Sequence, residues 1–385
     1  MERAELAAWL RLLEAPGMGL ESARRLLAAA GSPQAVFDVP LAHWREVLRA
    51  PLLAALEKPP EHLDELIDKT SAWLAESPLR HVLVLGDADY PELLLQTADP
   101  PLLLYLEGRR ELLAAPMLAI VGSRNPTIQG RDNAKAFGRA LSQAGLTIVS
   151  GLALGVDGAA HEGALAGGDA STVAVVGTGL DQSYPRRHQA LCRTIAERGL
   201  LVSEYSLGTP PLSPNFPRRN RIIAGLARGC LVVEAALQSG SLITARLASE
   251  AGREVFAIPG SIHSPQSRGC HALLRQGAKL VERTDDVLEE LPPTPRSHAA
   301  APAATPAATP AAAPVATPAP AAEAAIEPEL QQVLALMGYD PVSLDELVTR
   351  GGWPAAELSG WLLELEMAGR VARLAGQLFQ RRAQA

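Results

Sequence analysis

Runs of apolar, often β-branched residues alternate with amphipathic stretches from about residue 81 to residue 291. Between these runs lie stretches with the apolar spacing of a helix, such as IQGRDNAKAFGRALSQAG and ARLASEAG. Apolar strands that alternate with helices are typical of a parallel sheet covered on both faces. The pattern therefore predicts an α/β domain, a Rossmann-like, doubly wound and mainly parallel sheet, over residues 81–291. The predicted strands are HVLVLG, MLAIVG, LTIVSG, STVAVVG, LLVSEY, CLVVEA and REVFAIPG.

Residues 1–80 have a helical pattern instead, in the stretches ELAAWLRLLEA, ESARRLLAAAG and HLDELIDKTSAWLAE. The turn Pro16-Gly17-Met18-Gly19 separates the first two stretches. A Gly-apolar-Gly turn is typical of a helix–hairpin–helix, whose backbone amides bind a DNA phosphate. An ordinary turn with glycines at positive φ has the same pattern, so both interpretations stay open. We expect an N-terminal helical domain that resembles SAM or helix–hairpin–helix domains.

The C-terminal part divides into a low-complexity segment and a small domain. Residues 292–325 are almost entirely Ala, Pro and Thr, which predicts a disordered linker because few side chains can be buried. Residues 326–385 contain three helical stretches and the ribbon RVARLAGQLFQRR, a winged-helix-like pattern. The third helix would contact DNA in such folds, but here its charged residues are glutamates. We therefore expect this domain to bind protein, and we leave weak DNA contact through the ribbon arginines open.

Charge narrows the class of ligand. The whole chain has a net charge of −7, yet residues 121–228 contain 12 Lys and Arg against 7 Asp and Glu. Phosphate binding depends on the local field, so the basic middle favours an anionic ligand. Cys192, Cys230 and Cys270 lack the spacing of a disulfide framework or a zinc site, and we expect no metal or cofactor. The charged N-terminus and the lack of long apolar runs predict a cytoplasmic protein without membrane contact.

Parallel α/β sheets bind ligands at the carboxyl ends of their strands. Five consecutive strand ends here carry glycine, hydroxyl or arginine groups, which expose backbone N–H groups and bind phosphate. Ordinary βα turns also use glycine and serine, so only the combination predicts an anion-binding edge. The chain lacks both a G-x-G-x-x-G that opens the first helix and a P-loop. The candidate residues are Gly122, Ser123 and Arg124; Gly151; Gly179 and Arg186; Phe216, Arg218, Asn220 and Arg221 at the end of a long loop; and Ser239, Gly240 and Ser241.

The strand ends and their flanks resemble the DNA-processing protein A family (DprA, also called Smf). The resemblance covers residues 81–290 in unbroken order, and its motifs include AIVGSRNPTIQG, SGLALGVDGAAHEGAL, GTGLDQSYPRRH, SPNFPRRNRIIAGLARGCLVVEA and SGSLITARLASEAGREVFAIPG. It implies single-stranded DNA binding, a homodimer formed through the Rossmann-like core, and loading of RecA recombinase in natural transformation. A single-stranded DNA-binding protein is a further candidate partner.

The resemblance also implies residue roles. The turn Gly122-Ser123-Arg124 matches the family's DNA-contacting turn, and Arg186 occupies the position of a basic residue after Tyr-Pro. Phe216, Arg218, Asn220 and Arg221 match the loop that lines the DNA pocket, and Ser239-Gly240-Ser241 matches its opposite lip. Phe216 has two interpretations, stacking on a base or packing under its loop. Positive charges at Arg218 and Arg219 oppose the dipole of a helix that starts there, so we expect phosphate nearby.

Two enzymatic interpretations compete with binding. Asp157 and His161 have the spacing of one helix face, but their motif contains no Ser or Cys nucleophile. We interpret them as a helix cap and a buried structural histidine. The second is a nucleotide hydrolase similar to phosphoribohydrolases, which carry a PGGxGT turn followed by a catalytic glutamate. Here QSGSLITARLASE replaces that turn and lacks the early acid, so we expect a binding protein that is not an enzyme.

Overall fold

The computed structural model describes residues 1–168, 171–262, 264–291, 328–337 and 341–382. The chain forms two compact units, one of residues 1–126 and 130–293, the other of residues 127–129 and 294–385. The predicted linker at 292–325 lies outside the described residues, and the predicted boundaries at residues 80 and 326 stay predictions.

The first unit begins with a bundle of short helices. Three of them match the predicted helical stretches, whereas α3, η1 and α4 were not predicted. Gly17 has a φ of +76°, and α2 begins directly after Gly19, so the glycine turn separates α1 from α2. The helical elements are α1 (Arg3–Leu13), α2 (Leu20–Ala30), α3 (Pro33–Asp38), the 3-10 helix η1 (Leu41–Glu46), α4 (Ala50–Glu57) and α5 (Leu63–Glu76).

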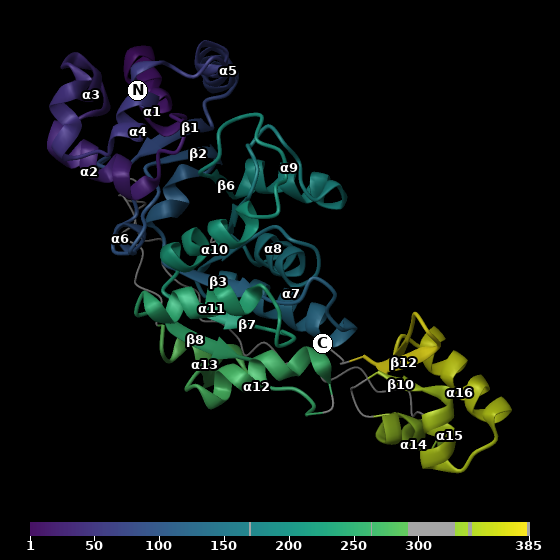
Figure 1. Cartoon of the computed structure of the whole chain (residues 1–385). Coiled ribbons are helices and arrows are strands. Elements are labelled where there is room, and N and C mark those ends of the chain that lie inside the picture. Colours follow the sequence, from purple (N-terminus) through teal and green to yellow (C-terminus); the bar gives the residue numbers. More distant parts are fainter. Residues whose placement is uncertain (169–170, 263, 292–327, 338–340, 383–385) are drawn as a thin grey trace, which may run out of the picture. The chain divides into compact units, whose positions relative to one another are not determined.

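Within the described residues, a nine-stranded sheet has the order β1-β2-β6-β5-β4-β3-β7-β8-β9 (Figure 1). The strands from β6 to β9 in this order are parallel, while β2 pairs antiparallel with both β1 and β6. Two of the strands, β2 and β9, were not predicted. The bounds are β1 (Arg80–Val84), β2 (Leu103–Gly108), β3 (Met117–Val121), β4 (Thr147–Ser150), β5 (Thr172–Val175), β6 (Leu200–Ser203), β7 (Gly229–Val232), β8 (Glu254–Ala257) and β9 (Lys279–Leu280).

Helices cover both faces of this sheet. Along β3, Leu118 and Ile120 pack into a core with α7 (Ile128–Gln143) and α8 (Val156–Gly167), whereas Ala119 and Val121 pack into another core with α10 (Asn215–Leu226) and α11 (Ser241–Glu250). This alternation confirms the predicted doubly wound, mainly parallel fold class. The remaining helical elements of the unit are α6 (Glu92–Leu95), η2 (Arg110–Ala114), η3 (Arg186–His188), α9 (Gln189–Arg198), η4 (Pro265–Ser267), α12 (Arg268–Arg275) and α13 (Thr284–Leu288).

Residues 215–221 correct one prediction, because they form the first two turns of α10 and not the end of a loop. Pro214 precedes the helix and Pro217 lies in its first turn, where a missing backbone N–H removes no helical hydrogen bond. The Asn215 side chain donates to the Gly177 carbonyl over 3.1 Å, which ties the helix start to the end of β5. The arginines of this segment therefore follow a helical phase.

The second unit has the predicted winged-helix arrangement. Its described elements are α14 (Pro328–Met337), β10 (Val342–Ser343), α15 (Leu344–Gly351), α16 (Ala355–Met367), β11 (Val371–Leu374) and β12 (Leu378–Arg381). The strands pair antiparallel in the order β10-β12-β11. Leu347, Leu358, Leu362 and Phe379 belong to the core between helices and strands.

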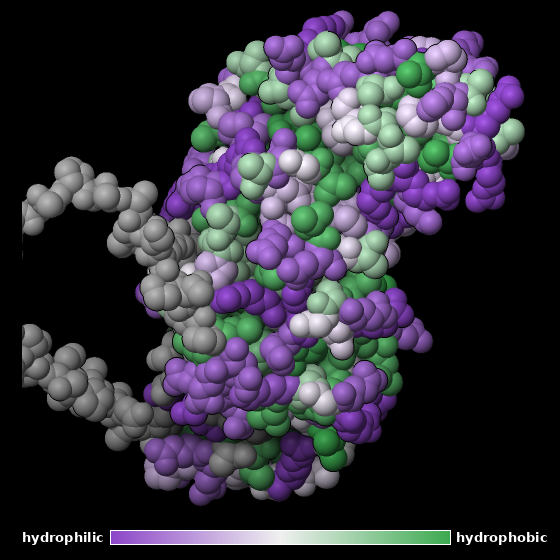
Figure 2. Space-filling view, turned by 90° about the vertical axis from the view of Figure 1, so that its left-hand side faces the viewer, coloured by the Kyte–Doolittle hydropathy of each residue, from purple (hydrophilic) through white to green (hydrophobic). Residues whose placement is uncertain are grey.

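Hydrophilic residues are interspersed with hydrophobic ones on the face shown in Figure 2, as on most folded proteins. Among the described residues, none of the helices is both long and apolar enough to cross a membrane.

Candidate functional site

A pocket of about 460 Å³ lies at the carboxyl ends of β3 and β7. The strand order reverses between these two strands, since β4, β5 and β6 follow on one side and β8 and β9 on the other. Doubly wound sheets bind ligands at such a switch point, because the neighbouring loops diverge there. The lining residues include Gly122, Ser123, Arg124 and Asn125 after β3; Ala153 and Asp157 after β4; Phe216, Arg219 and Asn220 of α10; and Gln238, Ser239, Gly240, Ser241 and Thr244 after β7.

One wall of the pocket is the start of α11. Ser241 is the first residue of this helix, and its hydroxyl lies 2.7 Å from the hydroxyl of Ser239. A helix N-terminus carries a partial positive charge and exposes N–H groups, both of which favour an anion. The predicted lip Ser239-Gly240-Ser241 therefore lies opposite the predicted turn Gly122-Ser123-Arg124, with the pocket between them.

The floor of the pocket contains Arg219, a residue missing from the sequence-based set of site residues. Its side chain is buried, with the residue 4% exposed, and its guanidinium donates to the carbonyls of Gly151 (2.6 Å) and Val175. Burial lowers the pKa of Arg219 to about 10, although the nearby Asp157 carboxylate acts in the opposite direction. The guanidinium therefore stays charged at neutral pH and supplies a fixed positive charge beneath the pocket.

Asp157 holds the loop after β4 from the other side. Its carboxylate accepts the N–H groups of Gly151 (3.1 Å) and Ala153 (3.3 Å). Burial raises the pKa of Asp157, and the charge of Arg219 opposes this rise. These contacts fix the loop, but the predicted helix cap was wrong, because Asp157 lies in the first turn of α8, whose N-cap residue is Gly155.

His161 has structural contacts on both ring nitrogens. Its Nε2 accepts the N–H of Leu152 (3.3 Å), and its Nδ1 donates to the hydroxyl of Thr172 (2.7 Å), which in turn donates to the Ile148 carbonyl. Burial, together with the charges of His188 and Arg219, lowers the pKa of His161 to about 3. The imidazole is therefore neutral and fully used in holding the loop, which agrees with a structural histidine.

Three side chains form a cluster at the rim of the pocket. Arg124 is exposed, and its guanidinium carbon lies 5.9 Å from the centre of the Phe216 ring. The ring of Tyr184 packs against Phe216 with a centre-to-centre distance of 5.4 Å and an interplanar angle of 38°. Phe216 is half-buried and separates the main pocket from a smaller cavity of about 110 Å³, which Gly151 also lines. Tyr184 was not in the sequence-based set.

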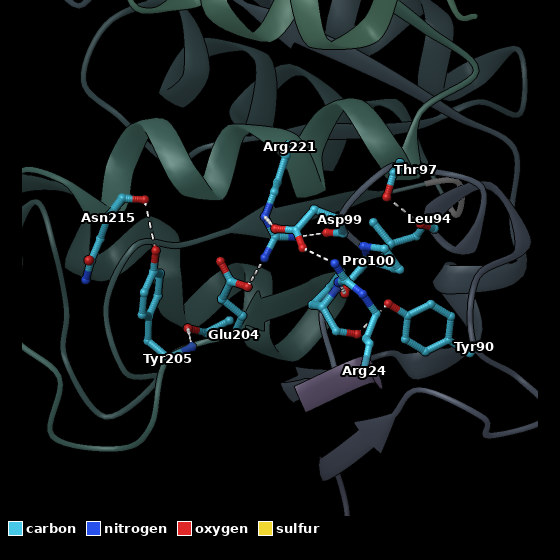
Figure 3. A network of polar contacts seen from close by, with 12 residues as sticks. Arg24, Tyr90, Leu94, Thr97, Asp99, Pro100, Glu204, Tyr205, Asn215 and Arg221 are labelled. Carbon is cyan, nitrogen blue, oxygen red and sulfur yellow. Dashed lines mark hydrogen bonds and ion pairs between the residues drawn. The ribbon is translucent and has the colours of Figure 1, made fainter. Parts of the chain in front are cut away.

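Arg218 and Arg221 lie outside this pocket, on another side of α10. Arg221 pairs with Glu204 and with Asp99, whose carboxylate also binds Arg24 of α2 at 2.6 Å (Figure 3). Arg218 borders a separate groove that α2 and the segment after β6 also line. The helical phase explains the division, because positions 216, 219, 220 and 223 face the pocket while positions 218 and 221 do not.

Gly179 and Arg186 also lie away from the main pocket, whereas the predicted Gly151 lines only the smaller cavity. Gly179 packs tightly in its loop, where an added Cβ would lie 2.6 Å from the Asp181 carboxylate and 2.7 Å from the Ser206 carbonyl. Arg186 is exposed in η3 and lines neither cavity. Spacing along α10 is the signal that could have found Arg219, since Phe216 and Ile223 mark the same face of the helix.

In the part of the chain that the structure describes, no group of three or more His, Cys, Asp or Glu side chains is placed so that it could bind a metal ion. Asp157 is the sole carboxylate among the described residues that line the pocket, and both of its N–H partners belong to the loop. The pocket is therefore suited to binding an anion.

Fold and site together define a Rossmann-like protein with a pocket at its switch point, lined by Arg124, Arg219 and the start of α11, and with a winged helix near its C-terminus. The chain belongs to the DNA recombination-mediator protein A family, whose model matches residues 81–292, and the DprA winged helix domain matches residues 299–377. These matches confirm the family that the sequence motifs indicated.

Relatives and solved structures agree with this assignment. Protein Smf of Escherichia coli K12 is 43% identical over 318 residues, which are 80% of this chain and 79% of that protein. The crystal structure of DNA processing protein A from Streptococcus pneumoniae is 38% identical, with a TM-score of 0.65, and covers 75% of this chain and 98% of that chain. DNA processing protein A from Helicobacter pylori, described with its single-stranded DNA binding mode, is 33% identical, with a TM-score of 0.50 and coverages of 55% and 95%.

Proposed function

We propose that this protein binds single-stranded DNA, with little sequence preference, in the switch-point pocket. The observation that carries the proposal is the positive pocket itself, with Arg219 in its floor, Arg124 at its rim and the start of α11 in its wall. These groups suit phosphate oxygens, which every nucleotide offers regardless of its base. The Helicobacter pylori relative, described with its single-stranded DNA binding mode, supports the same ligand class.

The aromatic cluster supports a single strand in particular. Bases of a single strand are free to stack on aromatic rings, and such stacking tolerates any base. The rings of Phe216 and Tyr184 lie beside Arg124, so one nucleotide at the rim can place its phosphate near the guanidinium and its base near the rings. Arg186 and Arg218, both exposed, are candidates for phosphates further along the strand.

We extend the proposal to a role in recombination. The family is described as DNA recombination-mediator protein A. We propose that the protein acts as a cytoplasmic homodimer that loads RecA recombinase onto single strands in natural transformation. A dimer presents two pockets to one strand, which raises the effective concentration of the second contact. The test is the ATPase rate of RecA on strands coated with a single-stranded DNA-binding protein; a rate that this protein does not increase contradicts loading.

Binding at the pocket is tested by fluorescence anisotropy of a labelled single strand and its duplex, titrated over a range of salt concentrations. The unaltered protein is expected to prefer the single strand. Arg124→Ala should weaken binding of every sequence and reduce the slope of log K against log salt by about 0.7, the value for one single-strand phosphate contact. The control is Arg45→Ala, which removes an exposed arginine from η1 and should change neither quantity. Equal affinity and slope in Arg124→Ala and the unaltered protein would reject the site.

A further inference from the structure

Helix α16 of the winged-helix unit is apolar on two opposite faces. Leu358, Leu362 and Leu365 are buried in the core of the unit. On the outer face, Leu363 is 58% exposed and Met367 is 83% exposed. A helix that is apolar all round is normally buried, whereas a surface helix carries polar residues on its outer face.

The exposed apolar residues form a continuous stripe. Ala356, Gly360, Leu363 and Met367 are all exposed and follow one another at spacings of four, three and four residues. Residues at this spacing lie above one another on one side of a helix. The stripe runs nearly the full length of α16.

Gly360 lies in the middle of this stripe, and no contact within the described part of its own unit requires a glycine there. A Cβ added at this position would meet no atom of the described structure within 4 Å. Glycine weakens a helix relative to alanine, so a glycine that nothing nearby requires is a cost to the fold. The absence of a side chain does, however, allow another backbone to approach closely.

The charged residues beside the stripe determine which kind of partner can bind it. Glu357 and Glu364 lie along one edge and Glu366 along the other, and α16 contains no Lys or Arg. Carboxylates repel a phosphate backbone, although the third helix of a winged-helix fold is the usual DNA-reading element. The same carboxylates attract a partner with cationic edges.

We propose that the outer stripe of α16 docks an amphipathic helix of a partner protein, whose apolar side chains are edged by lysine or arginine. Helices recognise such surfaces through apolar anchors at the spacing seen here. The close approach at Gly360 and the acidic edges are complementary to that partner. The surface uses no residue of the DNA pocket, so this proposal holds or fails independently of single-stranded DNA binding.

The test uses the full-length protein and a labelled helical peptide of the length of α16, with leucines in one stripe and lysines along both edges. A second peptide of the same composition, with leucines and lysines shuffled so that the stripe is lost, controls for charge. Anisotropy should show that the protein binds the striped peptide and does not bind the shuffled one. Leu363→Ser combined with Met367→Ser should weaken this binding by about tenfold or more, because both apolar anchors are lost.

Two further variants separate docking from folding. Gly360→Leu should strengthen α16 as a helix yet weaken peptide binding, since its side chain occupies the space of the approaching backbone. The control Leu95→Ser changes an exposed leucine of α6 and should leave binding unchanged. Failure to bind the striped peptide, or equal binding of both peptides, overturns the proposal. Loss of self-association in the double variant, measured by sedimentation, also overturns it, because the occupant is then a second copy of this chain.

Discussion

Leu152 has a φ of +56°, in the left-handed region that non-glycine residues rarely occupy. Its N–H is bound by His161 and its carbonyl by His188, whose Nδ1 lies 3.0 Å away. The preceding residue, Gly151, is held by Asp157 and Arg219. Such backbone strain persists where surrounding contacts determine the conformation. The loop beside the pocket is therefore set by buried side chains and not by its own sequence preference.

Because His161 is part of this arrangement, we expect the free energy of unfolding of the protein to decrease as the pH falls. The folded imidazole has a pKa of about 3, whereas an unfolded histidine has a pKa of about 6.5. Between these values the unfolded chain binds the extra proton. This histidine therefore lowers the free energy of unfolding as pH falls through that window, by up to about 1.4 kcal/mol per pH unit.

The measurement is urea unfolding of the unaltered protein and of His161→Asn between pH 7.5 and pH 4.5. The variant should show a smaller loss of stability on acidification. Burial of Asp157 acts in the opposite sense, since a raised pKa lets the folded carboxyl bind a proton first, but both proteins contain it. An identical pH dependence in the two proteins would contradict the role of His161.

The sequence predicted that the segments after β3 and β7 meet at the pocket, but it also placed Gly179 and Arg186 there, which line neither cavity, and it missed Arg219. Arg124 and the Ser239–Ser241 lip follow strands whose order in a parallel sheet brings their ends together, so position along the chain was sufficient. Arg219, by contrast, has arginines on either side of it in the sequence, at 218 and 221. Only the starting point and phase of α10 decide that Arg219 enters the floor while its neighbours do not.

At the scale of elements, α10 has two functions on different sides. One side presents Phe216 and Asn220 to the pocket, and the other carries Arg221 into the ion-pair network with Glu204 and Asp99. That network joins α10 to α2 through Arg24 (Figure 3). Arg221 therefore anchors the helix, while the opposite side of α10 lines the pocket.

We expect Arg221→Met to act on stability and not on DNA binding. The substitution leaves Glu204, whose side chain is 11% exposed, without its cation, and breaking a buried pair in this way costs about 3 kcal/mol. Chemical unfolding should show that loss, while the anisotropy of a labelled single strand gives an affinity close to that of the unaltered protein. Arg218→Met is the matched control, because Arg218 is exposed and its loss should change stability by no more than about 0.5 kcal/mol. A large loss of DNA affinity in a folded Arg221→Met protein would instead place Arg221 at the ligand.

The strands and helices differed in how far the sequence could predict them. Apolar runs gave the seven predicted strands, of which β1 is antiparallel and the other six are parallel strands that need no polar face. The two missed strands are an antiparallel one that follows Pro100-Pro101 and one of only two residues, β9. The short helices α3 and α4 were missed because a few turns show too little periodicity to be recognised.

At the scale of the whole molecule, the N-terminal helices and the sheet share one core. Trp9 and Leu10 of α1 belong to the same buried cluster as Val82 of β1 and Tyr105 of β2. Trp73 of α5 also packs edge-on against Tyr105, with ring centres 6.0 Å apart. The composition change near residue 80 marks a change of secondary structure, but packing continues across it.

Two truncations test this continuity. A chain of residues 77–293 exposes the apolar face of β1 and β2 and should aggregate or melt well below the intact protein, because a large hydrophobic contact is lost. A chain of residues 1–293 keeps every described residue that lines the pocket and should bind single-stranded DNA as the full chain does. Thermal unfolding and anisotropy are the measurements, and a stable, cooperatively folded 77–293 fragment would contradict the shared core.

The placement of the pocket between β3 and β7 decides which of its residues can change independently over evolutionary time. Arg124 and the lip around Ser239 lie on separate loops that leave a rigid sheet, so each can vary without disturbing the strands behind it. Arg219 and Asp157 cannot be substituted independently, because their side chains connect α10, the loop after β4 and the end of β5. Ligand preference can therefore diverge at the rim, while the floor has to change as a unit.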